Sequence, residues 1–362
     1  METKSILGTS LLVPSVKDLI SNKEQLTSAI PSKYVRHDQD PVSVLDKNSL
    51  PDVPVIDMAK LFSEKFMDLE LKKFDHACKD WGFFQLVNHG VSTELLEKVK
   101  SKTQEFFNLP KEEKQKFCQK PGEMEGFGQH FVKSEEQKLE WADLFYVVTQ
   151  PTHLRNPHLF SNIPQSFRDA IETYSEELKS LAHKIFDLVA KAVGMKPDEM
   201  KELFEEGWQA MRMNCYPPCP QPDLVIGLKP HSDATGLTIL LQVNDVVGLQ
   251  IKKDGFWIPV QPIPNAFIIN IGDMLEILTN GIYRSIEHRA TISSAKERLS
   301  IATFYNPKFD GYLAPAPSLI TAKTPAAFER ISFADYFQGY VSRELDGKSF
   351  IQVLRIQNNE IN

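Results

Sequence analysis

Residues 227–233 read GLKPHSD and residues 298–305 read RLSIATFY, and the stretch that these two segments enclose decides the fold. From residue 209 onward the chain breaks into short segments rich in β-branched and aromatic residues, with turn signals between them. The predicted strands cover residues 211–216, 238–242, 248–252, 257–260, 266–271, 288–291 and 299–305. Short strands at this spacing predict a sandwich or jelly roll, in which two packed sheets leave few open edges.

Three side chains of this stretch have the character of metal ligands: His231, Asp233 and His288. Side chains at i and i+2 of a strand point to the same face, so His231 and Asp233 can be directed at one point. The segment between Asp233 and His288 is long enough for the chain to cross the sheets and return beside the first strand. Two imidazoles and one carboxylate on one side of a metal are the facial ligand set of non-haem Fe(II) oxygenases, although zinc accepts the same ligand types.

Arg298 and Ser300 share one face of the last predicted strand by the same alternation. A guanidinium inside a sheet needs an anionic partner, because an unpaired buried charge is costly. One interpretation is a structural salt bridge to a remote acid. The other is a dicarboxylate cosubstrate that Arg298 and Ser300 bind at one end while its other end chelates the metal. Asn214 and Tyr216 form a third pair at i and i+2 and can donate further hydrogen bonds.

The chain as a whole predicts one compact unit with four regions. These are an extended N-terminal arm at 1–50, a helical region at 51–205, the β core at 206–310 and a helical tail at 311–362. Outside the core, strands are predicted near 54–57 and 81–87, and a glycine-rich loop at 122–129. Helices are predicted near 16–29, 69–79, 93–108, 112–118, 171–192, 326–328 and 333–341.

Composition bounds the partners of this chain. Its 362 residues carry a net charge of -7 without a long Lys/Arg block, which argues against nucleic acid and anionic membranes and favours a small-molecule substrate. The N-terminal apolar run is short and interrupted by Pro14, so neither a signal peptide nor a membrane span fits. Four cysteines form no CxxC pair and are expected to be reduced. We expect a cytoplasmic monomer.

The motifs together resemble a known family, the plant 2-oxoglutarate- and Fe(II)-dependent dioxygenases. The resemblance rests on His231-x-Asp233, His288, Arg298-x-Ser300 and Asn214-x-Tyr216, joined in the first half by the WGFF and NHG sequences of 81–90. It covers nearly the whole chain and is closest to the senescence-related branch, which includes alkaloid O-demethylases. It implies an α+β fold with a mainly β core, a double-stranded β-helix or jelly roll flanked by helices.

The resemblance also implies roles for the residues. His231, Asp233 and His288 would hold Fe(II), and Arg298 and Ser300 would bind the far carboxylate of 2-oxoglutarate. Tyr216 and Asn214 would assist at that carboxylate. O2 would take the remaining metal position, with ascorbate as the reductant. The expected reaction hydroxylates a C–H bond while 2-oxoglutarate becomes succinate and CO2, and a hydroxylated methoxy group would then lose formaldehyde.

The substrate pocket is implied by comparison with the anthocyanidin-synthase relatives, whose pocket positions match Leu144, Arg212, Phe304 and Asn306. Leu144 and Asn306 replace a tyrosine and a glutamate of the flavonoid-binding pattern, which argues against flavonoid oxidation. Two interpretations stay open for Phe304 and Phe127: stacking on an aromatic or polycyclic substrate, or ordinary packing in the core. Two other functions stay open: a non-redox, metal-assisted condensation of the norcoclaurine-synthase kind, which Arg298 and Ser300 disfavour, and a catalytically inactive binding protein.

Overall fold

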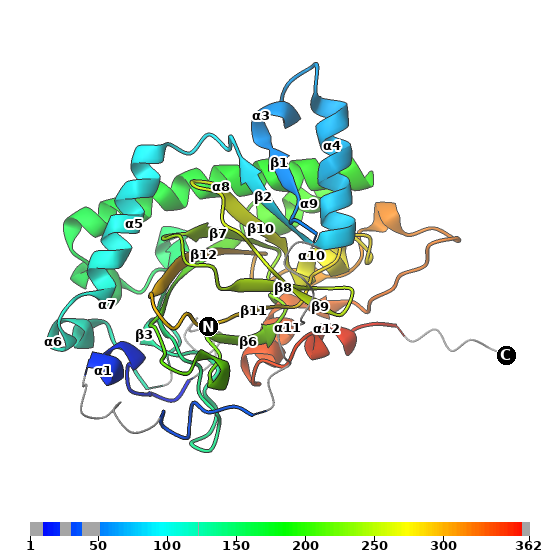
Figure 1. Cartoon of the computed structure of the whole chain (residues 1–362). Helices are drawn as coiled ribbons and strands as arrows, with labels where there is room; N and C mark the ends of the chain where they lie inside the picture. The colour runs from blue at the N-terminus through cyan, green and yellow to red at the C-terminus, as the bar shows by residue number, and fades with distance from the viewer. Residues whose placement is uncertain (1–9, 22–29, 38–50, 122, 357–362) are drawn as a thin grey trace.

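The computed structural model describes residues 10–21, 30–37, 51–121 and 123–356, and Figure 1 shows how they are arranged. A large sheet and a small sheet form the centre of the molecule. The large sheet has eight strands in the order β1 (Val55–Asp57), β2 (Phe83–Val87), β10 (Phe267–Ile271), β7 (Leu237–Gln242), β12 (Arg298–Asn306), β5 (Trp208–Tyr216), β4 (Asp143–Gln150) and β3 (Gly126–Gly128). The small sheet has four, in the order β6 (Leu228–His231), β11 (His288–Ala290), β8 (Leu249–Lys253) and β9 (Phe256–Pro259).

Pairing within the sheets is antiparallel except between β1 and β2. Strands from both halves of the chain share the large sheet, so the helical first half and the β-rich second half are joined through one hydrogen-bonded layer. The expected α+β fold with a jelly-roll core is confirmed. Two short strands, β13 (Tyr312–Leu313) and β14 (Ile331–Ser332), pair separately.

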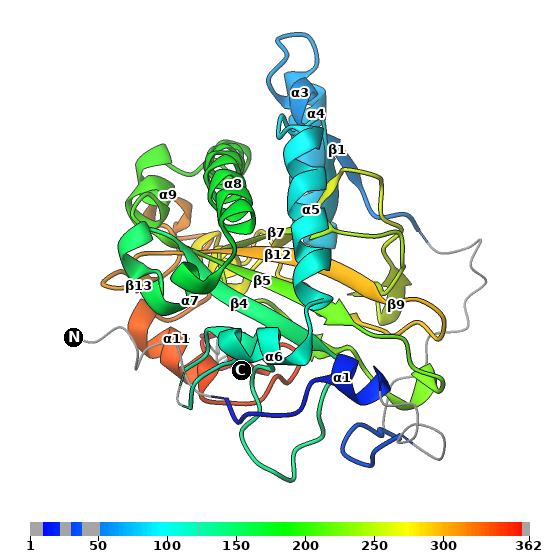
Figure 2. The ribbon, with the colours of Figure 1, turned by 90° about the vertical axis from the view of Figure 1, so that its left-hand side faces the viewer.

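Helices cover the large sheet because the face of its strands away from the small sheet is buried and mainly apolar. Every residue of β5 is buried, which requires cover on the side away from the small sheet. The helices α4 (Met67–His76), α5 (Thr93–Phe107), α8 (Gln165–Val193) and α9 (Pro197–Phe204) lie on that side, and α1 (Val16–Ser21) and α11 (Phe333–Val341) lie on the other (Figure 2). The remaining helices are α3 (Met58–Leu61), α6 (Lys111–Lys114), α7 (Pro157–Asn162), α10 (Asp273–Leu278) and α12 (Ser349–Gln352).

Local signals place the main helices close to where they were expected. The apolar stripe predicted over 171–192 lies within α8, whose buried side chains recur at intervals of three and four residues. Ser92 caps α5 by accepting a hydrogen bond from the Leu95 amide. The tail helix predicted at 333–341 is α11. In the described ranges, none of the helices is sufficiently long and apolar to cross a membrane.

Other segments differ from the prediction. The helix expected at 69–79 ends at His76 and continues as a π-helical turn, Ala77–Trp81, that closes at Gly82 with a φ of 58°. An added Cβ at Gly82 would lie 2.2 Å from the Arg284 carbonyl oxygen, so this left-handed position requires glycine. β2 therefore begins at Phe83.

Three further segments need correction. Residues 326–328 form no helix, and Phe328 instead pairs with Arg355 in an isolated bridge. The loop expected at 122–129 contains β3, and its Gly122 lies outside the described residues. The expected N-terminal helix begins as α1, while residues 22–29 also lie outside them. Strands β4 and β6 were not predicted.

Candidate active site

His231, Asp233 and His288 converge inside the jelly roll. Their ligand atoms all lie within 4.8 Å of one another, and all three residues are buried. Asp233 Oδ1 lies 3.4 Å from His231 Nε2 and 3.6 Å from His288 Nε2. The two imidazoles come from adjacent antiparallel strands, because His231 and His288 are direct register partners in β6 and β11. One ion can therefore contact one oxygen and two nitrogens from the same side.

Asp233 is positioned beside the two imidazoles by a local geometry other than the strand alternation that the sequence predicted. β6 ends at His231, so Asp233 lies in the turn that follows and not within the strand. Asp233 Oδ2 accepts hydrogen bonds from Thr238 Oγ1 at 2.6 Å and from Asn270 Nδ2 at 2.7 Å. These bonds hold one oxygen of Asp233 and leave Oδ1 directed at the imidazoles. Thr238 and Asn270 are supporting residues that the sequence did not single out.

Both imidazoles are oriented by the backbone. His231 Nδ1 lies 2.8 Å from the Lys229 carbonyl oxygen, and His288 Nδ1 lies 3.1 Å from that of Ile286. With Nδ1–H donating in each ring, Nε2 keeps its lone pair for a metal. Burial and the neighbouring His231 lower the pKa of His288 to about 4, which favours the neutral ring that a metal requires. The donor set therefore fits Fe(II).

Arg298, Ser300, Asn214 and Tyr216 lie together on two paired strands. In the register of β12 and β5, Arg298 is opposite Tyr216 and Ser300 is opposite Asn214. The Arg298 guanidinium lies 5.2 Å from the centre of the Tyr216 ring, and Asn214 Nδ2 lies 3.5 Å from Ser300 Oγ. The same cavity is lined by these four residues and by the three candidate metal ligands. The residues predicted to bind the metal and the dicarboxylate are therefore brought to one place.

Among the residues that the structure describes, Arg298 has no acid to neutralise it. It is 2% exposed, and its Nη2 donates a hydrogen bond to Gln242 Oε1 at 2.8 Å. Over the described ranges no carboxylate forms an ion pair with it, and its Nε has no hydrogen-bond partner. Burial lowers the pKa of this guanidinium, which shows that its charge is poorly solvated. This observation disfavours the structural salt bridge and fits an anionic ligand.

Gly248 makes room for the arginine. A Cβ at this position would lie 2.7 Å from Arg298 Cδ, so any larger residue would have to displace the side chain. The guanidinium is thus held from one side by the stacked Tyr216 ring and from another by the bare backbone of residue 248.

The rest of the cavity is mainly apolar and aromatic. Aromatic side chains are numerous in this lining, which suits an aromatic ligand. Arg212, Phe304 and Asn306 line it, as the sequence predicted. Further lining residues that the sequence did not predict are Met124, His130, Phe131, Tyr146, Phe337, Tyr340, Val341 and Leu345. Of these, the last four belong to α11 and the segment after it.

Phe127 lies away from the cavity. It is paired with Phe145 across β3 and β4, and both pack against Phe106 of α5 on the helix-covered face. Its placement at the substrate pocket is therefore corrected, because strand pairing directs the side chain into the core. Leu144 is buried and is the register partner of the cavity-lining Asn214, so its place at the substrate pocket stays a prediction.

Glu125 lies beside the cavity and gives a pH-dependent prediction. It is 8% exposed, its Oε1 accepts a hydrogen bond from the Val148 amide, and burial raises its pKa to about 7. Folding thus favours the protonated carboxyl, and that contribution is present below pH 4.5 and lost as the pH rises through 7. Near pH 8 we expect the free energy of unfolding of Glu125→Gln to exceed that of the wild type by roughly 1–3 kcal/mol, so that the variant unfolds at a higher temperature. In acid the two proteins should unfold at the same temperature. A difference in unfolding temperature that stays the same at every pH would contradict this prediction.

These features define a class of protein before any comparison is made. A jelly roll that brings two histidines, one aspartate and an acid-free arginine to a single cavity is the architecture of an iron-dependent oxygenase with an oxo-acid cosubstrate.

Comparison with known families agrees. The 2OG-Fe(II) oxygenase superfamily matches residues 207–307, and the family of N-terminal regions of non-haem dioxygenases in morphine synthesis matches residues 53–166. The chain belongs to the 2OG-Fe(II) oxygenase superfamily, and the expected resemblance is confirmed. Fe(II) and 2-oxoglutarate are accordingly its cofactor and cosubstrate.

Individual relatives are similar over nearly their full length. The Arabidopsis thaliana protein SRG1 is 56% identical, with 96% of this chain and 98% of the relative covered. A flavonoid 7-O-demethylase of Ocimum basilicum is 55% identical (99% and 94% covered), and thebaine 6-O-demethylase of Papaver somniferum is 50% identical (97% and 98%). The crystal structure of JOX2 with 2OG, Fe and JA superposes with a TM-score of 0.84 at 35% identity, covering 95% of this chain and 98% of that one.

Proposed function

We propose that this oxygenase oxidises a small aromatic or polycyclic metabolite and removes the methyl group of a methoxy substituent. The observation that carries the proposal is the cavity, in which the candidate metal ligands and Arg298 meet a wall of aromatic side chains. Two close relatives bear the name of O-demethylases, one for flavonoids and one for thebaine, which supports the outcome of the oxidation.

Each predicted residue has a place in this proposal. His231, Asp233 and His288 would hold Fe(II) through Nε2, Oδ1 and Nε2. Arg298 and Ser300 would bind the far carboxylate of 2-oxoglutarate, with Tyr216 and Asn214 beside it. When bound, the iron and 2-oxoglutarate supply the oxidation, in which O2 gives one oxygen atom to succinate and one to the substrate.

The surrounding residues determine which C–H bond is oxidised. Phe304, Phe131 and Tyr146 present aromatic faces or edges to the cavity, which suits a flat ring system. Phe337, Tyr340 and Leu345 close the side that the tail covers and exclude water. The role of the protein is to hold one methyl carbon near the metal in a fixed orientation.

The chemistry of demethylation balances without a further reactant. Hydroxylation converts the methoxy carbon into a hemiacetal while 2-oxoglutarate and O2 become succinate and CO2. The hemiacetal then breaks the bond between its CH2 carbon and the oxygen attached to the ring, and the proton of its hydroxyl passes to that oxygen, which leaves a phenol or alcohol and formaldehyde. No residue of the cavity has to act as a nucleophile, so this reaction requires positioning alone.

The test is a panel of methoxylated flavonoids and alkaloids incubated with the enzyme, Fe(II), ascorbate and 2-oxoglutarate. We expect equal amounts of succinate and formaldehyde and a product lighter by one CH2 group. A product heavier by one oxygen would show hydroxylation without demethylation. Product formation without succinate would favour the condensation alternative, which the buried, acid-free Arg298 already disfavours.

Arg212 gives a prediction about the substrate. Its guanidinium is 7% exposed and lines the cavity, and its Nε has no hydrogen-bond partner in the described part of the chain. We therefore expect the substrate to offer a phenolate, carboxylate or carbonyl oxygen to it. Arg212→Met should raise the substrate KM by roughly 10- to 100-fold, because a charge-assisted hydrogen bond is lost.

The control for Arg212 is the cosubstrate. The KM for 2-oxoglutarate should change by less than about twofold, because Arg298 and Ser300 bind that molecule in this proposal. Equal rises in both constants, measured as succinate formation with each reactant varied in turn, would remove Arg212 from substrate binding.

We also propose that the enzyme works as a cytoplasmic monomer with a small-molecule substrate and without nucleic acid or membrane. The net charge of -7 supports the absence of a polyanionic partner. The four cysteines are free thiols, and three of them are buried, which fits a reducing compartment. Sedimentation or light scattering of the purified protein tests the oligomeric state.

A further inference from the structure

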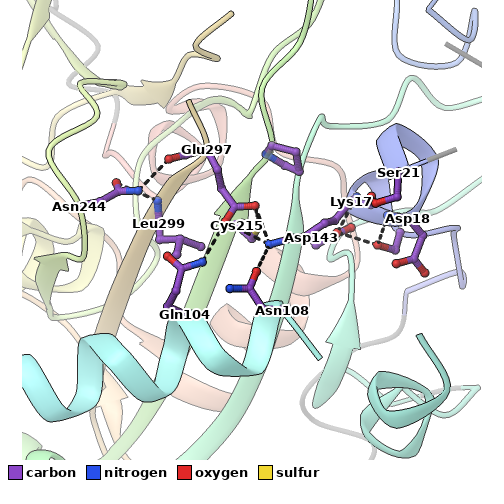
Figure 3. Close-up of polar contacts among 12 residues, drawn as sticks. Lys17, Asp18, Ser21, Gln104, Asn108, Asp143, Cys215, Asn244, Glu297 and Leu299 are labelled. Atoms are coloured by element: carbon purple, nitrogen blue, oxygen red, sulfur yellow. Dashed lines mark hydrogen bonds and ion pairs between the residues drawn. The ribbon is translucent and has the colours of Figure 1, made fainter. Parts of the chain in front are cut away.

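An ion pair between Lys17 and Glu297 lies at the start of β12, where Glu297 precedes Arg298 in the chain (Figure 3). Lys17 Nζ is 2.8 Å from Glu297 Oε2, and the two side chains are 19% and 20% exposed. Gln104 Nε2 and Cys215 Sγ also donate to the Glu297 carboxylate, each at 3.2 Å. Lys17 Nζ donates in addition to Asn108 Oδ1 at 2.7 Å. A residue of the N-terminal arm is thus tied to α5, β5 and the start of β12.

The arm is held in this position by a buried carboxylate. Asp143, the first residue of β4, is 2% exposed and accepts hydrogen bonds from Ser15 Oγ, the Val16 amide and the Lys17 amide at 2.8, 2.8 and 3.0 Å. These donors begin α1, so the carboxylate fixes the start of the helix and directs Lys17 toward Glu297. Asp143 is in turn the register partner of Cys215.

The network fixes the backbone on both sides of Arg298. Asn244 Nδ2 donates to the carbonyl oxygen of Glu297 at 2.7 Å, and the Leu299 amide donates to Asn244 Oδ1 at 3.3 Å. The Asn244 side chain therefore hydrogen-bonds to the backbone of both neighbours of Arg298. The Glu297 side chain connects the same short segment to the arm (Figure 3). Inside the cavity, by contrast, the Arg298 side chain contacts neutral groups, the Gln242 amide oxygen and the Tyr216 ring.

The same network also contacts β5, the strand that carries Asn214 and Tyr216. Cys215 lies between Asn214 and Tyr216 in β5, and its thiol donates to Glu297. Val16 of α1 is fully buried in the hydrophobic cluster that contains Tyr216. The arm therefore contacts, from outside the cavity, both strands that carry the proposed 2-oxoglutarate residues.

We propose that Lys17 and Glu297 are positioning residues for the cosubstrate: the arm holds the strand ends that present Arg298 and Tyr216 in the geometry that binds the far carboxylate. The physical reason is that a two-pronged hydrogen bond from a guanidinium tolerates little displacement, so a small shift of the strand ends that carry Arg298 and Tyr216 would weaken it. The inference rests on the proposed binding of 2-oxoglutarate by Arg298, Ser300 and Tyr216.

The test uses Lys17→Met and Glu297→Gln in the full-length, Fe(II)-loaded enzyme. We expect the KM for 2-oxoglutarate to rise roughly tenfold in each, with kcat and the substrate KM within about twofold of the wild type. Anaerobic titration of 2-oxoglutarate, followed by the visible absorption of its complex with Fe(II), should show the same loss of affinity without turnover. The double variant should be no worse than either single one, because the two residues act as a unit.

The controls separate positioning from general stability. Lys102→Met removes the ion pair with Glu105 on the exposed face of α5 and should leave 2-oxoglutarate affinity unchanged. Lys17→Arg keeps the charge and should recover most of the affinity. An unchanged 2-oxoglutarate KM in Lys17→Met and Glu297→Gln would overturn the inference, as would equal losses in every kinetic constant. A wild-type protein that forms no succinate would instead refute the proposed function.

Discussion

The His231→Ala variant is expected to lose bound iron and to form succinate at least about 100-fold more slowly than the wild type. The reason is geometric: two imidazole nitrogens and one carboxylate oxygen meet at one point, and removing one of them leaves two protein ligands. Metal analysis after gel filtration and succinate formation at saturating 2-oxoglutarate measure the two effects. The fold should survive, because the backbone pairing of His231 with His288 does not depend on the ring.

A matched control is available on α8. His183 is half-buried on this helix, away from the cavity lining, so His183→Ala should retain iron and activity. Adding excess Fe(II) to His231→Ala should restore little activity, because the variant has two protein ligands for the metal instead of three. Wild-type activity in His231→Ala at low iron would show that the metal binds elsewhere.

The Arg298→Met variant should show the second large effect, a rise of about 100-fold or more in the KM for 2-oxoglutarate. Two charge-assisted hydrogen bonds to a buried carboxylate are lost, and the methionine side chain preserves most of the volume. The substrate KM, measured at saturating 2-oxoglutarate, should change little. Arg298→Lys keeps the charge without the planar fork, so its KM for 2-oxoglutarate should lie between those of the wild type and Arg298→Met.

Stability provides an independent measurement for the same variant. Because the guanidinium is buried without an acid among the described residues, it destabilises the ligand-free fold. Arg298→Met should therefore unfold at the same or a higher temperature than the wild type without 2-oxoglutarate, and should gain no stability when 2-oxoglutarate is added. A structural salt bridge predicts the opposite, a marked loss of stability in the ligand-free protein.

The sequence predicted much of the β core because its signal is local. Short apolar strands between turn residues placed β5, β7, β10 and β12 to within a few residues. It missed β4, although residues 143–150 form a fully buried strand in all but the last position. A continuous apolar run does not show the alternation that marks a half-buried strand, and helix and strand readings of it compete.

The structure brings the predicted metal and cosubstrate residues to one cavity, but the strand geometry expected for one pair of them was wrong. The i, i+2 argument holds for Arg298 and Ser300, which lie in one strand. For His231 and Asp233 it does not, because the strand ends between them and hydrogen bonds from Thr238 and Asn270 orient the carboxylate. The two partners lie 5 and 37 residues from Asp233, and no local pattern links them to it.

By itself, the sequence determined the chemical capacity of this protein, because the identity and spacing of two histidines, one aspartate and the arginine–serine pair are properties of the chain. The tertiary structure alone decided the rest. It left Arg298 without an acid, brought α11 over the cavity, turned Phe127 into the core and docked Lys17 on Glu297. These outcomes depend on contacts between segments far apart in the chain, where packing and burial, and not local periodicity, determine which side chains meet.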